Sequence, residues 1–351
     1  MGIKSLHKLL KKQAAEAYRE ISLSEYSFRK VAVDASLFLY KYKAAAGDRW
    51  LSALLNLIMC LRRNEVHCFF VYDGKPPDEK IAEKERRAGE KEKLREKVAA
   101  VEYALNLYTR TGEVEQILLD ITARRKKSPT KVKRLMGKEK AIDKFYLERY
   151  LERLKNQVVS LSAEDIVNSQ TLLTLLGVPF CTSETEAETL CAFMSLTGKV
   201  DAVMSDDTDV IAYGSPFLLH KIDTTTGKCI SLSLEGILES TGFSLETFRD
   251  LCIMCGTDYN TNIRKVGPVN SFKLLQEYES IDNLPEKYDK TCLNHLRVRE
   301  LFTTFDYEIP EPPFCSEPVW EELGKFLFTH RCQYSLDRIK KDLGRREVSF
   351  E

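Results

Sequence analysis

Acidic residues repeatedly follow short apolar segments in this chain of 351 residues. The segments are rich in β-branched or aromatic residues, as 31–33 and 69–72 are, and such segments are typical of buried strands. In open α/β sheets, the groups that carry chemistry gather at the carboxyl ends of the strands. The acidic residues of interest are Asp34, Asp73, Glu184, Glu186, Asp207, Asp209 and Asp258.

Carboxylates that converge at one sheet edge repel one another, and a hard divalent cation bound by oxygen ligands relieves that repulsion. The pairs Glu184/Glu186 and Asp207/Asp209 each place two carboxylates on one side of an extended segment, because side chains alternate with period two. For Asp34 alone, a helix N-cap is an equally good interpretation. The two pairs are hard to explain as caps, so the pattern predicts a Mg²⁺ or Mn²⁺ site.

Other site chemistries find little support in the sequence. The ten cysteines are scattered, mostly within apolar stretches, which is typical of reduced thiols in an intracellular protein. The chain has one Cys-x-x-Cys motif and no histidine at zinc-finger spacing, which argues against a zinc site. No serine or cysteine lies in a nucleophile elbow. No apolar stretch approaches the length of a membrane span, and the N-terminus lacks a signal-peptide core.

The formal net charge of zero hides a strong asymmetry. Residues 78–155 contain 22 Lys and Arg against 15 Asp and Glu, a local net charge of +7, so the remainder carries −7. Within this stretch, residues 124–140 hold nine basic residues and one acid. A charge run of this kind is usually a solvated face. Beside a carboxylate cluster, however, the polarity suits a phosphodiester substrate held by its backbone phosphates.

Expected strands at 31–33, 68–72, 178–181, 202–204 and 217–221 alternate with helical patterns. This alternation predicts a mostly parallel α/β sheet. The connection between the second and third of these strands is too long for one helix, so residues 80–155 are expected to form a protruding helical insertion.

A helix–turn–helix is expected near the C-terminal end of the sheet region. Residues 245–255 are predicted to be a helix, and the Gly267-Pro268 turn opens a second helix that runs to about residue 278. Backbone N–H groups at such a helix start can bind a phosphate oxygen. A plain helical corner is the alternative, and the nearby Asp258 favours the phosphate interpretation.

These motifs together resemble the flap endonuclease / XPG-type family of structure-specific 5′ nucleases, and their order along the chain is that of the family. The matching segments are 1–3, 31–36, 73–77, 183–188, 207–209, 213–216 and 256–268. The resemblance implies a PIN-like fold with a helical arch insertion and a C-terminal helix-two-turn-helix region. It also implies two Mg²⁺ ions, which Mn²⁺ can replace. The first-metal residues would be Asp34, Asp73, Glu184 and Glu186, and the second-metal residues would be Asp207, Asp209 and Asp258.

The resemblance also implies roles for residues near the scissile phosphate. Lys80 matches a lysine that stabilises the phosphate. The family has an arginine one to two turns further on, for which Lys84, Arg86 and Arg87 are the candidates because the spacing here is shorter. Tyr40 matches an aromatic residue that stacks on a terminal base, and a buried core tyrosine is the alternative.

Backbone contacts with DNA are implied at three glycines, Gly2, Gly256 and Gly267, with a K⁺ ion expected in the turn at 262–266. Branched or flapped DNA is the implied partner. A monomer in the nucleus is expected, and the last residues contain no motif for a sliding clamp.

Junction-cleaving or bubble-cleaving nucleases, an RNase and a catalytically silent DNA-binding factor remain alternatives. The compact chain suits a divergent or viral family member.

The expected organisation has five parts. Residues 1–79 form an N-terminal nuclease region, and 80–155 form the basic arch. An internal nuclease region spans 156–240, the helix-two-turn-helix and C-terminal helical region spans 241–341, and 342–351 is a short tail.

Overall fold

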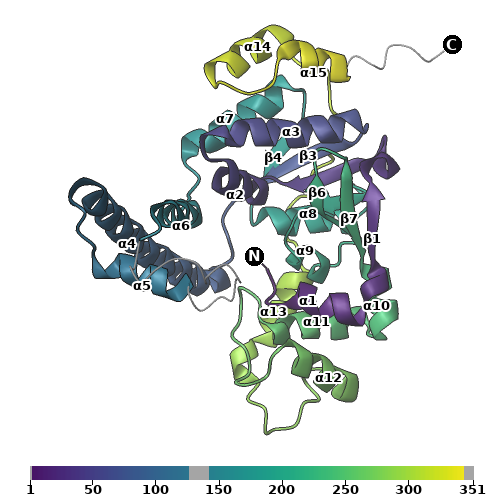
Figure 1. Ribbon diagram of the computed structural model, residues 1–351. Helices are drawn as coiled ribbons and strands as arrows, with labels where there is room; N and C mark the ends of the chain where they lie inside the picture. The colour runs from purple at the N-terminus through teal and green to yellow at the C-terminus, as the bar shows by residue number, and fades with distance from the viewer. Residues whose placement is uncertain (1, 126–141, 344–351) are drawn as a thin grey trace, which may run out of the picture.

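The computed structural model describes residues 2–125 and 142–343, and seven strands within these ranges form one sheet (Figure 1). Their order is β1-β7-β6-β5-β2-β3-β4. Strands β2 to β6 are parallel to one another, β7 pairs antiparallel with β6, and β1 pairs antiparallel with β7. The bounds are β1 Tyr18–Ser22, β2 Lys30–Asp34, β3 His67–Tyr72, β4 Phe180–Thr182, β5 Ala202–Met204, β6 Phe217–Asp223 and β7 Lys228–Ser233. The predicted mostly parallel, PIN-like sheet is confirmed, whereas β1 and β7 were not among the expected strands.

Helices cover both faces of the sheet, and each face has its own hydrophobic core. In β3 the side chains alternate between the cores: Phe69 and Val71 face one, and Phe70 faces the other. The first core includes residues of α1 (Leu6–Gln13), α8 (Ala187–Leu196), α9 (Asp209–Ala212), α10 (Leu234–Thr241), α11 (Leu245–Cys255), α12 (Pro268–Tyr278) and α13 (His295–Thr303). The second includes residues of α2 (Ala35–Ala46), α3 (Trp50–Arg63), α7 (Ala163–Leu175), α14 (Trp320–Thr329) and α15 (Leu336–Leu343).

The long insertion is helical, as predicted, and projects from the sheet (Figure 1). It comprises α4 (Ile81–Thr111), α5 (Gln116–Arg125) and α6 (Lys144–Gln157). These helices bury apolar side chains against one another, among them Val101, Leu118 and Leu147, in a core separate from both cores of the sheet. Most of the basic run at 124–140 lies outside the described residues.

Helices α11 and α12 are joined by the loop 256–267, which confirms the expected helix–turn–helix arrangement. Both helices lie below the sheet in Figure 1, near α1 and α13. Asp250 of α11 fixes α13 to this unit, because it accepts two hydrogen bonds of 2.7 Å from Arg299 and one of 2.9 Å from the backbone of Ile281. Within the described ranges, none of the helices is long and apolar enough to span a membrane.

Candidate active site

Three neighbouring parallel strands deliver carboxylates to one edge of the sheet. Asp34 ends β2, Asp73 directly follows β3, and Asp207 lies just beyond β5. The structure confirms that Asp34 is a helix N-cap and also shows that its second oxygen lies in the carboxylate cluster. Its Oδ1 caps α2 by accepting the Leu37 N–H at 3.0 Å, while its Oδ2 accepts a hydrogen bond of 3.1 Å from Ser205 inside the cluster.

Helix starts and a loop supply the remaining carboxylates. Glu186 is the N-cap of α8, Glu188 lies in the first turn of that helix, and Asp209 begins α9; all three are buried. Asp258 follows α11. One oxygen from each of Glu188, Asp207 and Asp209 lies within 4.8 Å of the other two. Such an all-oxygen donor set can hold a metal ion, and it fits the hard cations Mg²⁺ and Mn²⁺.

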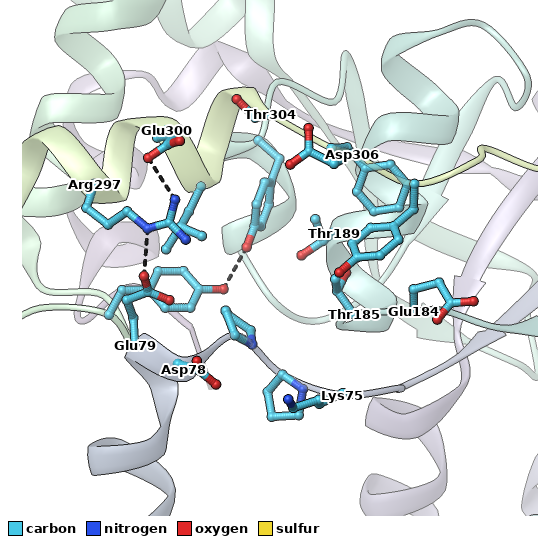
Figure 2. Close-up of a pocket in the computed structure, with 17 residues that line it drawn as sticks. Lys75, Asp78, Glu79, Glu184, Thr185, Thr189, Arg297, Glu300, Thr304 and Asp306 are labelled. Carbon is cyan, nitrogen blue, oxygen red and sulfur yellow. Dashed lines mark hydrogen bonds and ion pairs between the residues drawn. The ribbon is translucent and has the colours of Figure 1, made fainter.

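The structure corrects the expected pairing of Glu184 with Glu186. The prediction treated this segment as extended, but the chain enters α8 at Ala187, so Glu186 and Glu188 are the two that lie at the cluster. Glu184 is exposed in the preceding loop, where its carbonyl accepts the Lys75 N–H at 3.2 Å. Figure 2 shows Glu184 at the wall of a separate pocket. The motif Glu-x-Glu occurs twice in 184–188, first as Glu184/Glu186 and then as Glu186/Glu188. The second copy lies at the start of the expected helical pattern, and this position was the signal for Glu188 in the sequence.

Cationic side chains lie directly against the carboxylates. The Lys80 ammonium forms an ion pair with Glu186, lies 3.1 Å from Asp258 and 3.9 Å from Glu188, and is largely buried. The Arg87 guanidinium forms an ion pair of 2.5 Å with the same Asp258 carboxylate. Two cations from the start of the insertion therefore neutralise part of the cluster.

Arg86, which was also a candidate, faces away from the cluster. Arg87 follows Lys80 by seven positions, which is nearly two helical turns, so these side chains share one face. Arg86 is instead exposed and forms ion pairs with Glu83 and Glu90 on its own helix. Of the two arginines, the structure brings Arg87 to the carboxylates and corrects the inclusion of Arg86.

A cleft of about 660 Å³ opens between the sheet edge and the insertion. Carboxylates such as Asp34 line one wall, and Lys80, Lys84 and Arg87 line the other. Tyr40 of α2 also lines the cleft, and its exposed fraction of 40% excludes the alternative that it is a core residue. Both Lys84 and Tyr40 can therefore contact a ligand in the cleft.

The N-terminal segment lies against the cluster, and the DNA contact expected of Gly2 stays a prediction. Gly2 has a φ of 89°, and a Cβ added there would lie 2.0 Å from Oδ1 of Asp207. The next residue, Ile3, donates its N–H to Oδ1 of Asp209 at 2.6 Å. Any side chain at position 2 would consequently displace the carboxylates.

The other two predicted glycines frame the turn between α11 and α12. Gly256 accepts the Lys4 N–H at 3.1 Å, and a Cβ added there would lie 2.2 Å from Oδ1 of Asn262. Gly267 is the N-cap of α12. Oδ1 of Asn262 is buried and has no hydrogen-bond partner among the described residues. The side-chain oxygen of Asn262 is thus available as a ligand in the turn where the K⁺ ion was expected.

Burial raises the pKa values of several carboxyls in the cluster. The pKa of Asp34 rises from 3.8 to about 7, first because of burial and then because of Asp73. Burial, with Asp207 next, raises the pKa values of Glu188 and Asp209 well above their ordinary range. The ionised forms are therefore unfavourable until positive charge approaches, as expected of a site built for cations.

Comparisons with known proteins identify the family. The XPG N-terminal domain matches residues 1–94, and the XPG I-region matches residues 177–258. A probable RAD2-like endonuclease of Invertebrate iridescent virus 3 is 32% identical, and the match covers 94% of each chain. This chain belongs to the XPG family of structure-specific nucleases. The sequence resemblance is thereby confirmed.

Flap endonuclease 1 of Homo sapiens is also similar to this XPG-family nuclease. It is 28% identical, and the match covers 99% of this chain and 87% of the human protein. Among solved structures, the catalytic core of Rad2 in complex with a DNA substrate matches 97% of this chain and 99% of its own, with a TM-score of 0.65 and 18% identity. The structure of flap endonuclease-1 from Methanococcus jannaschii matches 93% of this chain and 94% of its own, with a TM-score of 0.59 and 23% identity. These two structures support the fold.

The raised pKa of Asp34 predicts how the metal-free protein responds to pH. Between about pH 4 and pH 7 the folded protein binds a proton at Asp34 that the unfolded chain has released, so the free energy of unfolding decreases as the pH rises. In Asp34→Asn, which retains an oxygen to cap α2 but cannot ionise, this part of the decrease is expected to vanish. Urea unfolding in EDTA between about pH 4 and pH 7 measures the free energy of unfolding of the native protein and of Asp34→Asn. The same pH dependence in the two proteins would contradict the prediction.

Proposed function

We propose that this protein is a structure-specific 5′ endonuclease that cuts flapped DNA with two Mg²⁺ ions, and that it also has 5′ exonuclease activity. The observation that carries the proposal is one cleft with a carboxylate wall and a cationic wall, formed by Glu186, Glu188 and Asp207 opposite Lys80 and Arg87. The carboxylates bind the metal ions, and the lysine and arginine bind the substrate phosphate. The family membership supports nuclease chemistry at this cleft.

Divalent cations bound here would activate a water molecule and stabilise the charge on the scissile phosphate and the leaving oxygen. The chain's own residues orient the substrate. Lys80 and Arg87 turn from their carboxylate partners to phosphate oxygens, which are similar anionic acceptors. Tyr40 stacks on the base next to the cut, and such stacking contributes about 1–3 kcal/mol per base.

The rest of the duplex is held at a distance from the cut. Gly256 and the start of α12 at Gly267 contact the backbone, because N–H groups at a helix start bind phosphate oxygens. Lys84 of α4 adds a positive charge on the wall of the cleft that the insertion forms. The 5′ single strand passes along the helices α4 to α6.

Cleavage of a 5′-flap duplex tests the proposal, with Glu188→Gln and Glu184→Gln as a matched pair. Both substitutions remove one negative charge from the same short segment. Glu188→Gln is expected to lower the single-turnover rate by about 100-fold or more, because its carboxylate lies in the cluster. Glu184→Gln is expected to cut at the native rate, because it lies outside the cluster.

Equal rates for the two variants would contradict the assignment of Glu188, and a native protein inert with both Mg²⁺ and Mn²⁺ would contradict the nuclease proposal. The same assay on nicked, gapped, bubble and four-way junction DNA distinguishes the related activities. We expect the 5′ flap to be cut fastest. Faster cutting of the four-way junction or the bubble would favour the corresponding alternative.

The neighbouring arginines provide a second matched pair. Arg87→Ala is expected to lower the single-turnover rate on the flap on the order of 100-fold, because it removes a cation that faces the cleft. Arg86→Ala removes the same charge from the exposed face of α4 and is expected to change the rate little. Rates should be measured with enzyme in excess over substrate. A similar loss in both variants would show that the overall charge of the insertion matters rather than the position of Arg87.

A further inference from the structure

Two buried tyrosines separate the carboxylate cleft from a second pocket. That pocket has a volume of about 350 Å³ and is lined by Tyr213 and Tyr259. Figure 2 shows other residues of its wall, including Thr185 and Thr189 at the start of α8 and the ion pairs of Arg297. Both tyrosine side chains are nearly inaccessible, with exposed fractions of 2% and 6%.

The hydroxyl groups of the two tyrosines form a directed chain of hydrogen bonds that ends on Glu186. Tyr259 donates its O–H to Oε2 of Glu186 at 2.8 Å. The two hydroxyl oxygens are 2.7 Å apart. Because Tyr259 has a single O–H and uses it on Glu186, Tyr213 must be the donor in the bond between the tyrosines.

This chain of bonds joins three of the segments that carry carboxylates. Tyr213 directly follows α9, which begins with Asp209, and Tyr259 directly follows Asp258. Glu186 itself precedes α8. The Phe302 ring of α13 packs edge-on against both tyrosine rings, at centroid distances of 5.1 Å and 6.2 Å. Packing against Phe302 and the hydrogen bond between their hydroxyls therefore restrict the orientation of both tyrosine rings.

The two oxygens of Glu186 have different donors. Oε2 accepts from Tyr259, whereas Oε1 forms the ion pair with Lys80. Lys80 cannot keep that ion pair once a divalent cation binds Oε1, because the ammonium group and the metal ion repel each other and compete for the same oxygen. Tyr259 is then the remaining donor among the described residues that prevents Glu186 from rotating.

We propose that Tyr259, supported by Tyr213, is a positioning residue that holds Glu186 in the orientation in which its other oxygen binds a divalent cation. This inference rests on the proposed function, because it assumes that Glu186 binds a metal ion and that Lys80 leaves it. The competing explanation is that Tyr259 is an ordinary core residue whose hydroxyl merely satisfies its own burial. The two explanations differ in what removal of the hydroxyl does to metal binding.

The test is Mn²⁺ binding by titration calorimetry, without DNA, to the native protein and to Tyr259→Phe. This substitution removes one hydroxyl and keeps the ring against Phe302. We expect Mn²⁺ affinity to fall by about 10- to 100-fold, the range for loss of a hydrogen bond that orients a metal ligand. Tyr334→Phe is the control, because it removes the hydroxyl of another buried tyrosine that lies away from the cluster. This hydroxyl donates a hydrogen bond of 3.2 Å to Asp342. It should bind Mn²⁺ like the native protein.

Native affinity in Tyr259→Phe would overturn the proposal. If that variant does not fold, Tyr213→Phe takes its place, since it keeps the Tyr259 hydroxyl but removes the group that donates to it. A smaller loss of affinity is expected there, and native affinity would again overturn the proposal.

Failure of the proposed function gives a different result. A native protein that binds no Mn²⁺ would contradict the metal site itself. In that case a crystal structure of Tyr259→Phe still decides the positioning role. A Glu186 side chain that has rotated would support it, and one that keeps its native rotamer would overturn it.

Discussion

Carboxylates from neighbouring parallel strands meet at one edge of the sheet, where burial leaves little water to screen their repulsion. The raised pKa values of Asp34, Glu188 and Asp209 follow from this crowding. Positive charge from Lys80 and Arg87 offsets part of it. The zero net charge of the chain likewise combines an acidic body of −7 with a net charge of +7 in residues 78–155. A bound cation is the remaining contribution that would make the cluster favourable.

The fold keeps the carboxylates together despite their repulsion, because each of them lies on a rigid element. Strand ends fix Asp34 and Asp207, and the starts of short helices fix Glu188 and Asp209. The N-terminal segment closes the cluster from another side and tolerates no side chain at Gly2. On the opposite wall, the first turns of α4 present their cations through helical spacing, so the position of the insertion decides which charges enter the cleft.

Local patterns predicted the parts of this structure that depend on neighbours in sequence. The parallel strands and most of the acidic residues were predicted because each apolar run and the carboxylate after it are contiguous in sequence. The helical insertion was predicted because the connection between two of the strands is too long for one helix. Strand β1 was missed, since it is stabilised by pairing with residues about 200 positions away. Strand β7 was missed although it also pairs with its sequence neighbour β6. Glu184 was chosen over Glu188 because the point at which the segment turns into α8 is set by packing. The choice between Arg86 and Arg87 depended on the rotation of α4 relative to the sheet, which spacing alone does not define.

The central claim is that the buried carboxylates form a cation site with Glu186 and Glu188 as the pair from the start of α8. Anomalous diffraction from crystals soaked in Mn²⁺ tests it most directly, because the signal identifies the metal and locates it without reference to activity. The account predicts Mn²⁺ bound to oxygens of this cluster, with Glu188, Asp207 and Asp209 among the ligands, and no ion at Glu184. Mn²⁺ absent from the cluster, or bound through Glu184, would contradict it.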